Sequence, residues 1–134
     1  MALLLPLLLF VLMLNTQLPA RDFPPITRID AIAVQSQVFE ATSPRRPVLI
    51  RSAQEAADYF PVSDLARLCS EVDFSRQVVL LFAWRGSGQD RLEPVEDDSP
   101  PGGLVFVFSP GRTRDLVAHH QVFVLRSDVA WSIR

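Results

Sequence analysis

The chain has 134 residues, with 13 basic residues, 15 acidic residues and a formal net charge of −2. This length supports one small domain with a single hydrophobic core. Affinity for a nucleic-acid backbone depends on a concentrated positive patch, so the near-balanced charge argues against a nucleic-acid-binding protein. Every basic residue is Arg and none is Lys, which also excludes catalysis through a lysine Schiff base.

The first segment of the chain has the character of an export signal. Residues 2–14 are apolar and uncharged, and this length fits the h-region of a signal peptide but is too short to span a bilayer. Ala20 supplies the small residue that a signal peptidase requires. We therefore expect residues 1–20 to be a signal peptide. Residues 21–134 then form one exported domain, periplasmic, cell-envelope or secreted, without membrane insertion; an uncleaved N-terminal anchor is the alternative.

The first half of this domain combines extended segments with two short helices. Apolar residues alternate loosely over residues 26–39, which predicts one or two strands, and residues 48–51 predict another. Ser52 and Glu55 have the spacing of a capping box, in which the Ser52 hydroxyl binds the Glu55 amide and the Glu55 carboxylate binds the Ser52 amide. This pair predicts a helix over residues 53–60.

A second helix is predicted over residues 63–71, with Ser63 as its cap. Cys69 is the single cysteine of the chain, so the fold has no intramolecular disulfide. We expect its thiol to be buried and inert, because it falls on an apolar helical stripe. The predicted stripe consists of Val62, Leu65, Ala66, Cys69 and Val72.

The second half of the domain is predicted to be mostly strand. Residues 78–84, 104–108 and 122–125 are uninterrupted apolar runs, which suit strands covered on both faces. Segments rich in Pro and Gly separate them, at residues 99–103 and 109–111. The predicted fold is α+β: a curled, mostly antiparallel sheet with two short helices packed on one side.

The stretch after the longest apolar run is the first candidate site. Gly86 and Gly88 bracket Ser87, but the spacing is shorter than the Gly-x-Ser-x-Gly of a hydrolase elbow. We interpret the glycines as a bulge or tight bend, with positive φ at one of them and the Ser87 hydroxyl facing solvent. A small serine hydrolase that uses Ser87 with His119 or His120 is the alternative.

The remaining polar residues offer further alternatives. Asp90 or Asp115 is a candidate third member of a triad. His119 and His120 are adjacent on a predicted strand, so they point to opposite faces and cannot bind one metal ion through a single face. Residues 110–114 form a charged hairpin tip, with anion binding as the alternative.

An acidic cluster precedes the first Pro-Gly segment. It lacks the ligand spacing and central glycine of a calcium loop, so we interpret it as a solvated strand edge that opposes aggregation. A carbohydrate- or calcium-binding accessory module that uses this cluster with Trp84 and Trp131 is a further alternative. No catalytic residue, metal ligand or cofactor is predicted. The cluster consists of Glu93, Glu96, Asp97 and Asp98.

Two segments, VLIRSAQEAADYF and VDFSRQVVLLFAWRGSG, resemble the PrcB-like family of secreted domains, which is named for a lipoprotein that associates with and stabilises an exported protease complex. They share a strand, a capped helix, an Asp-Phe-Ser link and a long apolar strand that ends in glycines. The resemblance covers roughly residues 48–88; this chain lacks the lipoprotein cysteine and the family's usual Thr-Gly-Gly-aromatic turn. The resemblance implies a non-enzymatic exported domain that binds or stabilises a partner protein, and it assigns no catalytic residues.

Export is directly testable. Cleavage after Ala20 predicts that the exported protein begins at Arg21. Intact-mass analysis of the protein recovered outside the cytoplasm measures this start. Recovery of the full-length chain in the membrane fraction would instead identify an uncleaved anchor.

Overall fold

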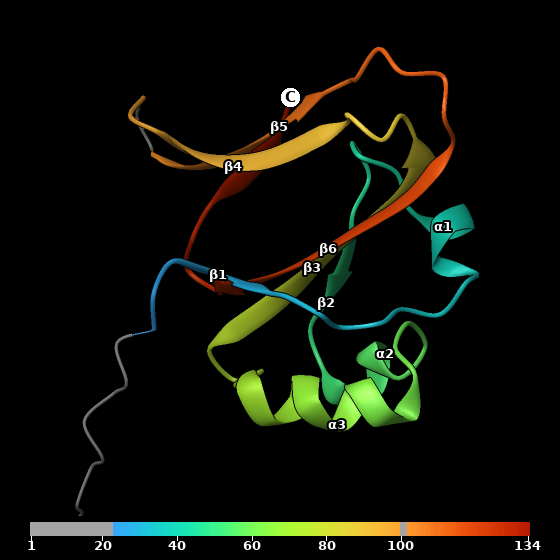
Figure 1. Cartoon of the computed structure of the whole chain (residues 1–134). Coiled ribbons are helices and arrows are strands. Elements are labelled where there is room, and N and C mark those ends of the chain that lie inside the picture. Colours follow the sequence, from blue (N-terminus) through green and yellow to red (C-terminus); the bar gives the residue numbers. More distant parts are fainter. Residues whose placement is uncertain (1–22, 100–101) are drawn as a thin grey trace, which may run out of the picture.

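The computed structural model describes residues 23–99 and 102–134 (Figure 1). The predicted signal peptide, residues 1–20, lies outside these residues. In the part of the chain that is described, no helix is long and apolar enough to cross a membrane.

The strands form two sheets. The first sheet is antiparallel and has the order β1 (Ile26–Ile29), β6 (Val117–Arg126), β3 (Gln77–Gly86) and β2 (Val48–Ile50). The second sheet has the order β4 (Arg91–Asp97), β5 (Gly103–Ser109) and β7 (Trp131–Ile133), with β5 and β7 parallel. The prediction of a mostly antiparallel α+β fold is confirmed, but the strands form two sheets rather than one curled sheet.

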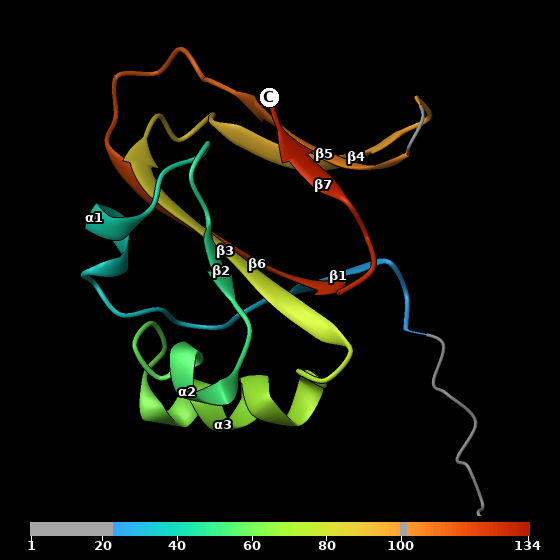
Figure 2. The ribbon, with the colours of Figure 1, turned by 180° about the vertical axis from the view of Figure 1, so that it is seen from behind.

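Three short helices complete the described fold, one more than predicted: α1 (Val38–Ala41), α2 (Ala53–Ala56) and α3 (Val62–Glu71). Figure 2 shows α2 and α3 together on one side of the first sheet, with the second sheet on the other side. The first sheet is therefore the middle layer of the molecule.

The side chains of the middle layer alternate between two apolar clusters. Val79 and Leu81 of β3 pack with the helices, whereas Leu80 and Phe82 pack against the second sheet. All four side chains are fully buried. The uninterrupted apolar run of β3 thus follows from burial on both faces, as predicted.

The predicted helix starts are right in one case and wrong in the other. The Glu55 amide donates to Ser52 Oγ over 3.1 Å, which confirms the cap of α2. The Glu55 carboxylate, however, accepts from the Arg51 amide over 2.9 Å and not from the Ser52 amide. Ser63 is not the cap of α3, because Pro61 occupies the N-cap and α3 has no side-chain cap.

The buried face of α3 differs from the predicted apolar stripe. Leu68, which the stripe omitted, is fully buried and Val72 is buried, whereas Val62 is 85% exposed and Ala66 is exposed. Cys69 is only half-buried. Leu65 and Val72 of the predicted stripe do pack with the core cluster, so the stripe is right in part, with Leu68 at the centre of the buried face.

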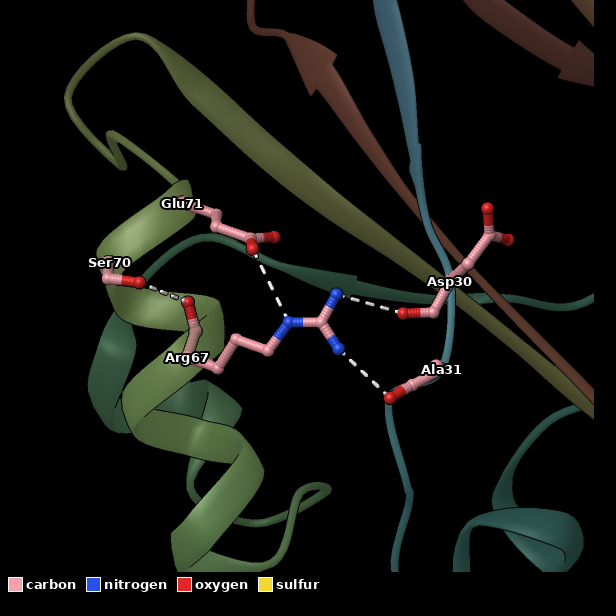
Figure 3. Close-up of polar contacts among 5 residues, drawn as sticks. All are labelled: Asp30, Ala31, Arg67, Ser70 and Glu71. Carbon is pink, nitrogen blue, oxygen red and sulfur yellow. Dashed lines mark hydrogen bonds and ion pairs between the residues drawn. The ribbon is translucent and has the colours of Figure 1, made fainter.

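Residues 26–39 form one strand and one helix. Val38, predicted to be in a strand, is a buried residue of α1. The strand β1 ends early because Ala31 has φ of 54°, a left-handed conformation that is costly for a residue with a Cβ. The Arg67 guanidinium of α3 holds this turn (Figure 3), donating to Ala31 O over 2.9 Å and to Asp30 O over 3.0 Å. Glu71 orients the guanidinium by accepting from Arg67 Nε over 3.3 Å.

A buried threonine takes the place of a strand residue at the edge of β3. The pairing of β2 with β3 ends at Val48 opposite Leu81. Two residues further along β3, Thr42 Oγ1 accepts from the Ala83 amide over 2.8 Å and donates to the Ala83 carbonyl over 2.5 Å. One hydroxyl therefore satisfies both backbone groups of Ala83.

Thr42→Val keeps the shape of this side chain and removes its hydroxyl. The Ala83 amide and carbonyl then stay buried without partners, and we expect a loss of about 1–3 kcal/mol in the free energy of unfolding. Urea denaturation measures this loss. Thr42→Ser, which keeps the hydroxyl, is the control; an equal loss in both variants would show that methyl packing, not hydrogen bonding, is the contribution of Thr42.

Candidate functional site

The structure brings the turn after β3 into contact with the segment before β6. The two segments are far apart in sequence, but β3 and β6 pair with Trp84 opposite His119 and Gly86 opposite Val117. The candidate residues Ser87, Asp90, Asp115 and His119 consequently gather at one end of the first sheet. Their contacts decide what this cluster does.

The Ser87 hydroxyl is engaged by the protein itself. Ser87 Oγ contacts the Thr113 hydroxyl and accepts from the backbone amides of Gln89 and Thr113, each over 3.2 Å. The prediction that this hydroxyl only faces solvent is therefore wrong. Its contacts join the turn to the loop before β6.

The two histidines point to opposite faces of β6, as predicted. His119 Nε2 lies 2.7 Å from the Ser87 carbonyl oxygen, and its ring stacks on Trp84 with centroids 4.9 Å apart. His120 Nε2 lies 2.6 Å from the Ile32 carbonyl oxygen. Because His119 contacts the carbonyl and not the hydroxyl of Ser87, the geometry offers Ser87 no histidine base.

Both candidate carboxylates bind N–H groups of the same cluster. Asp90 accepts from the Trp84 indole over 3.1 Å and from the Gly111 amide over 2.7 Å. Asp115 accepts from the Gly88 amide over 3.1 Å. Hydrogen bonds from Thr113 and then Gly88, together with the nearby His119, hold the pKa of the Asp115 carboxyl below its ordinary value. These carboxylates position the loop rather than orient a catalytic histidine.

Glycine is needed at positions 86 and 88 because other side chains approach the backbone closely there, and not because the backbone has positive φ. Gly86 belongs to the regular pairing of β3, and a Cβ there would overlap the Asp90 carboxylate. A Cβ at Gly88 would lie 2.5 Å from Asp115 Oδ2. The expectation of positive φ at Gly86 or Gly88 is wrong. Among the described glycines, positive φ occurs at Gly102 and Gly103.

Gly111, which the sequence placed in a turn and in a charged hairpin tip, is also the glycine that packs most tightly against backbone atoms in this cluster. A Cβ at this position would lie 2.5 Å from Ser87 Oγ and 2.7 Å from the backbone carbon of Gln89. Backbone atoms move less easily than a flexible side chain, so this contact fixes the loop directly on the turn. The two segments therefore pack directly against each other.

The residues of the proposed accessory module do not gather into a site. Glu93, Glu96 and Asp97 lie along the edge strand β4, which agrees with the predicted solvated edge. Within residues 23–99 and 102–134, no group of three or more His, Cys, Asp or Glu is placed to hold a metal ion. Trp84 is 5% exposed, so its ring offers no face for a sugar, and Trp131 packs edge-on against Phe106.

Comparison of the chain with protein-family models, with curated proteins and with solved structures found no significant match.

The sequence predicted the strand β6 only over residues 122–125 and so did not indicate its outer edge at residues 117–121. The Arg126 amide donates to Pro25 O over 3.1 Å, toward β1, and the Ser127 amide donates to Arg76 O over 2.8 Å, toward β3. The backbone N–H and C=O groups of successive residues point to opposite edges of a strand. The backbone groups of the even-numbered residues of β6 therefore point to β1, and those of the odd-numbered residues point to β3.

The pairing of β1 with β6 ends at Ile29 opposite Val122. Beyond this point the chain diverges from β6 after the left-handed turn (Figure 1). The backbone groups of Ala118 and His120 therefore point outward, and they have no backbone partner in the described part of the chain. We call residues 117–121 the open edge of β6.

The edge strand β4 is protected from pairing. The amides of Leu104 and Phe108 donate toward β7, so the backbone groups of the even-numbered residues of β5 point to β7. The backbone groups of its odd-numbered residues therefore point to β4. The register of β4 then places the Pro94 nitrogen on the outer side. A proline there removes a donor from the middle of the edge, which is a common protection against strand addition.

The other edges are short or occupied. The strands β1 and β7 have 4 and 3 residues, and Thr42 occupies the edge of β3 at Ala83. The open edge of β6 instead begins beside two exposed apolar residues, Leu116 (75% exposed) and Val117 (38% exposed). No sequence pattern marked this edge, because it depends on where β1 leaves β6.

Asp115→Asn tests the role of the Asp115 carboxylate. Because its pKa is lowered in the folded protein, the carboxylate stabilises the fold above about pH 4, and this contribution is lost as the pH falls through the folded pKa. We expect the wild type to be more stable than Asp115→Asn at pH 7 and the difference to shrink below about pH 4. Thermal unfolding across this range measures it; a difference that does not vary with pH would contradict the assignment.

Proposed function

We propose that this chain is a non-enzymatic exported domain that binds an extended segment of a partner protein along the open edge of β6. The proposal is based on Ala118 and His120, whose backbone N–H and C=O groups point outward beyond the end of β1. Such groups form the main-chain hydrogen bonds of strand addition. An added segment running antiparallel to β6 lies in line with β1 and continues the first sheet.

Side chains around the open edge support this mode of binding. Leu116 and Val117 offer apolar contacts at the end where the segment would leave the sheet.

The apolar residues 2–14 and the resemblance of residues 48–88 to PrcB-like domains support an exported partner. An exported protease complex is the partner class that this resemblance implies. The hydrolase alternative has less support, because the Ser87 hydroxyl is used within the fold and His119 contacts the Ser87 carbonyl oxygen.

Ala118→Pro is a selective test of this proposal. The Ala118 amide points away from β3, so proline removes an outward donor and leaves the pairing of β3 with β6 intact. Peptides selected from a random displayed library against the wild-type domain serve as probes. We expect Ala118→Pro to weaken the binding of these peptides by about tenfold or more, because proline removes one hydrogen-bond donor and its ring clashes with the added segment.

Arg28→Pro is the matched control. Arg28 is exposed on β1, and the register places its amide on the outer side, away from β6. This variant should bind the probes as the wild type does. Slower amide exchange at Ala118 and His120 in the complex locates the added strand. Unchanged binding by Ala118→Pro would exclude the open edge of β6 as the binding site.

A further inference from the structure

A second feature lies at the end of the second sheet where β4 begins and β5 ends. An open hollow of about 610 Å³ lies between the turn 88–91 and the segment 109–112. Arg91 and Arg112 both line it, one from each segment. One arginine from each of the two segments therefore lines a common space.

These two arginines are available for a ligand. The ion pairs in the described part of the chain join Arg28 with Asp30, Arg67 with Glu71 and Arg126 with Asp128. Neither Arg91 nor Arg112 takes part in one. The carboxylate that lines the hollow, Asp90, is occupied by the Trp84 indole and the Gly111 amide.

Close packing and a hydrogen bond hold the base of the hollow in place without a ligand. Gly111 lies directly on the turn, where a Cβ would meet Ser87 Oγ and Gln89 backbone atoms. Asp90 binds the Gly111 amide over 2.7 Å. A site whose backbone is already fixed loses less conformational entropy when it binds.

Charge along the second sheet favours an anion at this end. The register places Arg91 opposite Ser109 at one end of the β4–β5 pair and Asp97 opposite Gly103 at the other. Glu96 and Asp98 flank Asp97 and line the separate hollow at that far end. At the Arg91 end, two arginines line the hollow with one carboxylate, Asp90, whereas at the far end four carboxylates line the hollow with one arginine, Arg126. The balance of charge therefore favours a negatively charged ligand at the Arg91 end.

We propose that this hollow is an oxyanion site, in which Arg91 and Arg112 bind a carboxylate, phosphate or sulfate group. A guanidinium group presents a planar fork of N–H donors that matches the oxygens of such groups. The site is distinct from the open edge of β6, and its test does not depend on strand addition. It assigns a ligand to part of residues 110–114, where the sequence left anion binding as an alternative.

Amide and arginine side-chain NMR spectra of the domain, titrated with sodium phosphate, sodium sulfate or sodium succinate at constant ionic strength, test the site. We expect saturable shifts at Gly88, Gln89 and Gly111 and at the Nε–H groups of Arg91 and Arg112. Saturation by phosphate or sulfate identifies a tetrahedral ligand group, and saturation by succinate identifies a carboxylate. Either result supports the proposal.

Arg91→Gln and Arg112→Gln should each raise the dissociation constant about threefold to fivefold, as expected for one exposed charge pair. Arg51→Gln, at an exposed arginine outside the hollow, is the control and should leave binding unchanged. Well-dispersed spectra of the variants establish that they are folded. Shifts that rise linearly without saturation, or an equal effect of Arg51→Gln, would overturn the proposal and show only non-specific ion binding.

Discussion

The pairing of β3 with β6 is the constraint on which the rest of the structure depends. It extends over ten residues of each strand and forms the centre of the middle layer. Helices cover one face and the second sheet covers the other, so each strand contributes to both apolar clusters. The same pairing places Trp84 opposite His119 and thereby joins the turn after β3 to the segment before β6. The pairing of β3 with β6 therefore positions both the core and the candidate site.

Side chains complete the sheets where strands end. Thr42 supplies the hydrogen bonds that a longer β2 would give to Ala83, and Pro94 removes a donor from the exposed edge of β4. Arg67 holds Ala31 in the left-handed turn that separates the chain from β6. The open edge of β6 differs in this respect from the edges at β4 and at Ala83, and it is the feature that the proposed strand addition uses.

Local patterns in the sequence predicted the parts of the fold that depend on local contacts. The Ser52 cap follows from residues three positions apart, and the apolar run of β3 reflects burial on both faces. We predicted positive φ at Gly86 or Gly88, whereas Gly88 is required because the Asp115 carboxylate leaves no space for a Cβ. The sequence did not indicate this contact because Asp115 lies 27 residues further along the chain. Thr42 and Ala83 are similarly separated by 41 residues. Contacts of this kind depend on the register of distant strands, which no periodicity in a single sequence specifies.

One segment connects the two proposed binding sites. The loop before β6 carries Arg112 at the oxyanion hollow and leads through Leu116 into the open edge. Its position is fixed between these points by Ser87, which contacts Thr113, and by Asp115, which accepts from the Gly88 amide. A partner segment added along β6 would extend from the edge toward this loop. Residues 112–117 of this chain join the two proposed sites, so a partner that supplies both an added strand and an acidic group would bind them as linked sites. Binding at two linked sites raises the overall affinity without any further contact, because the second contact becomes intramolecular.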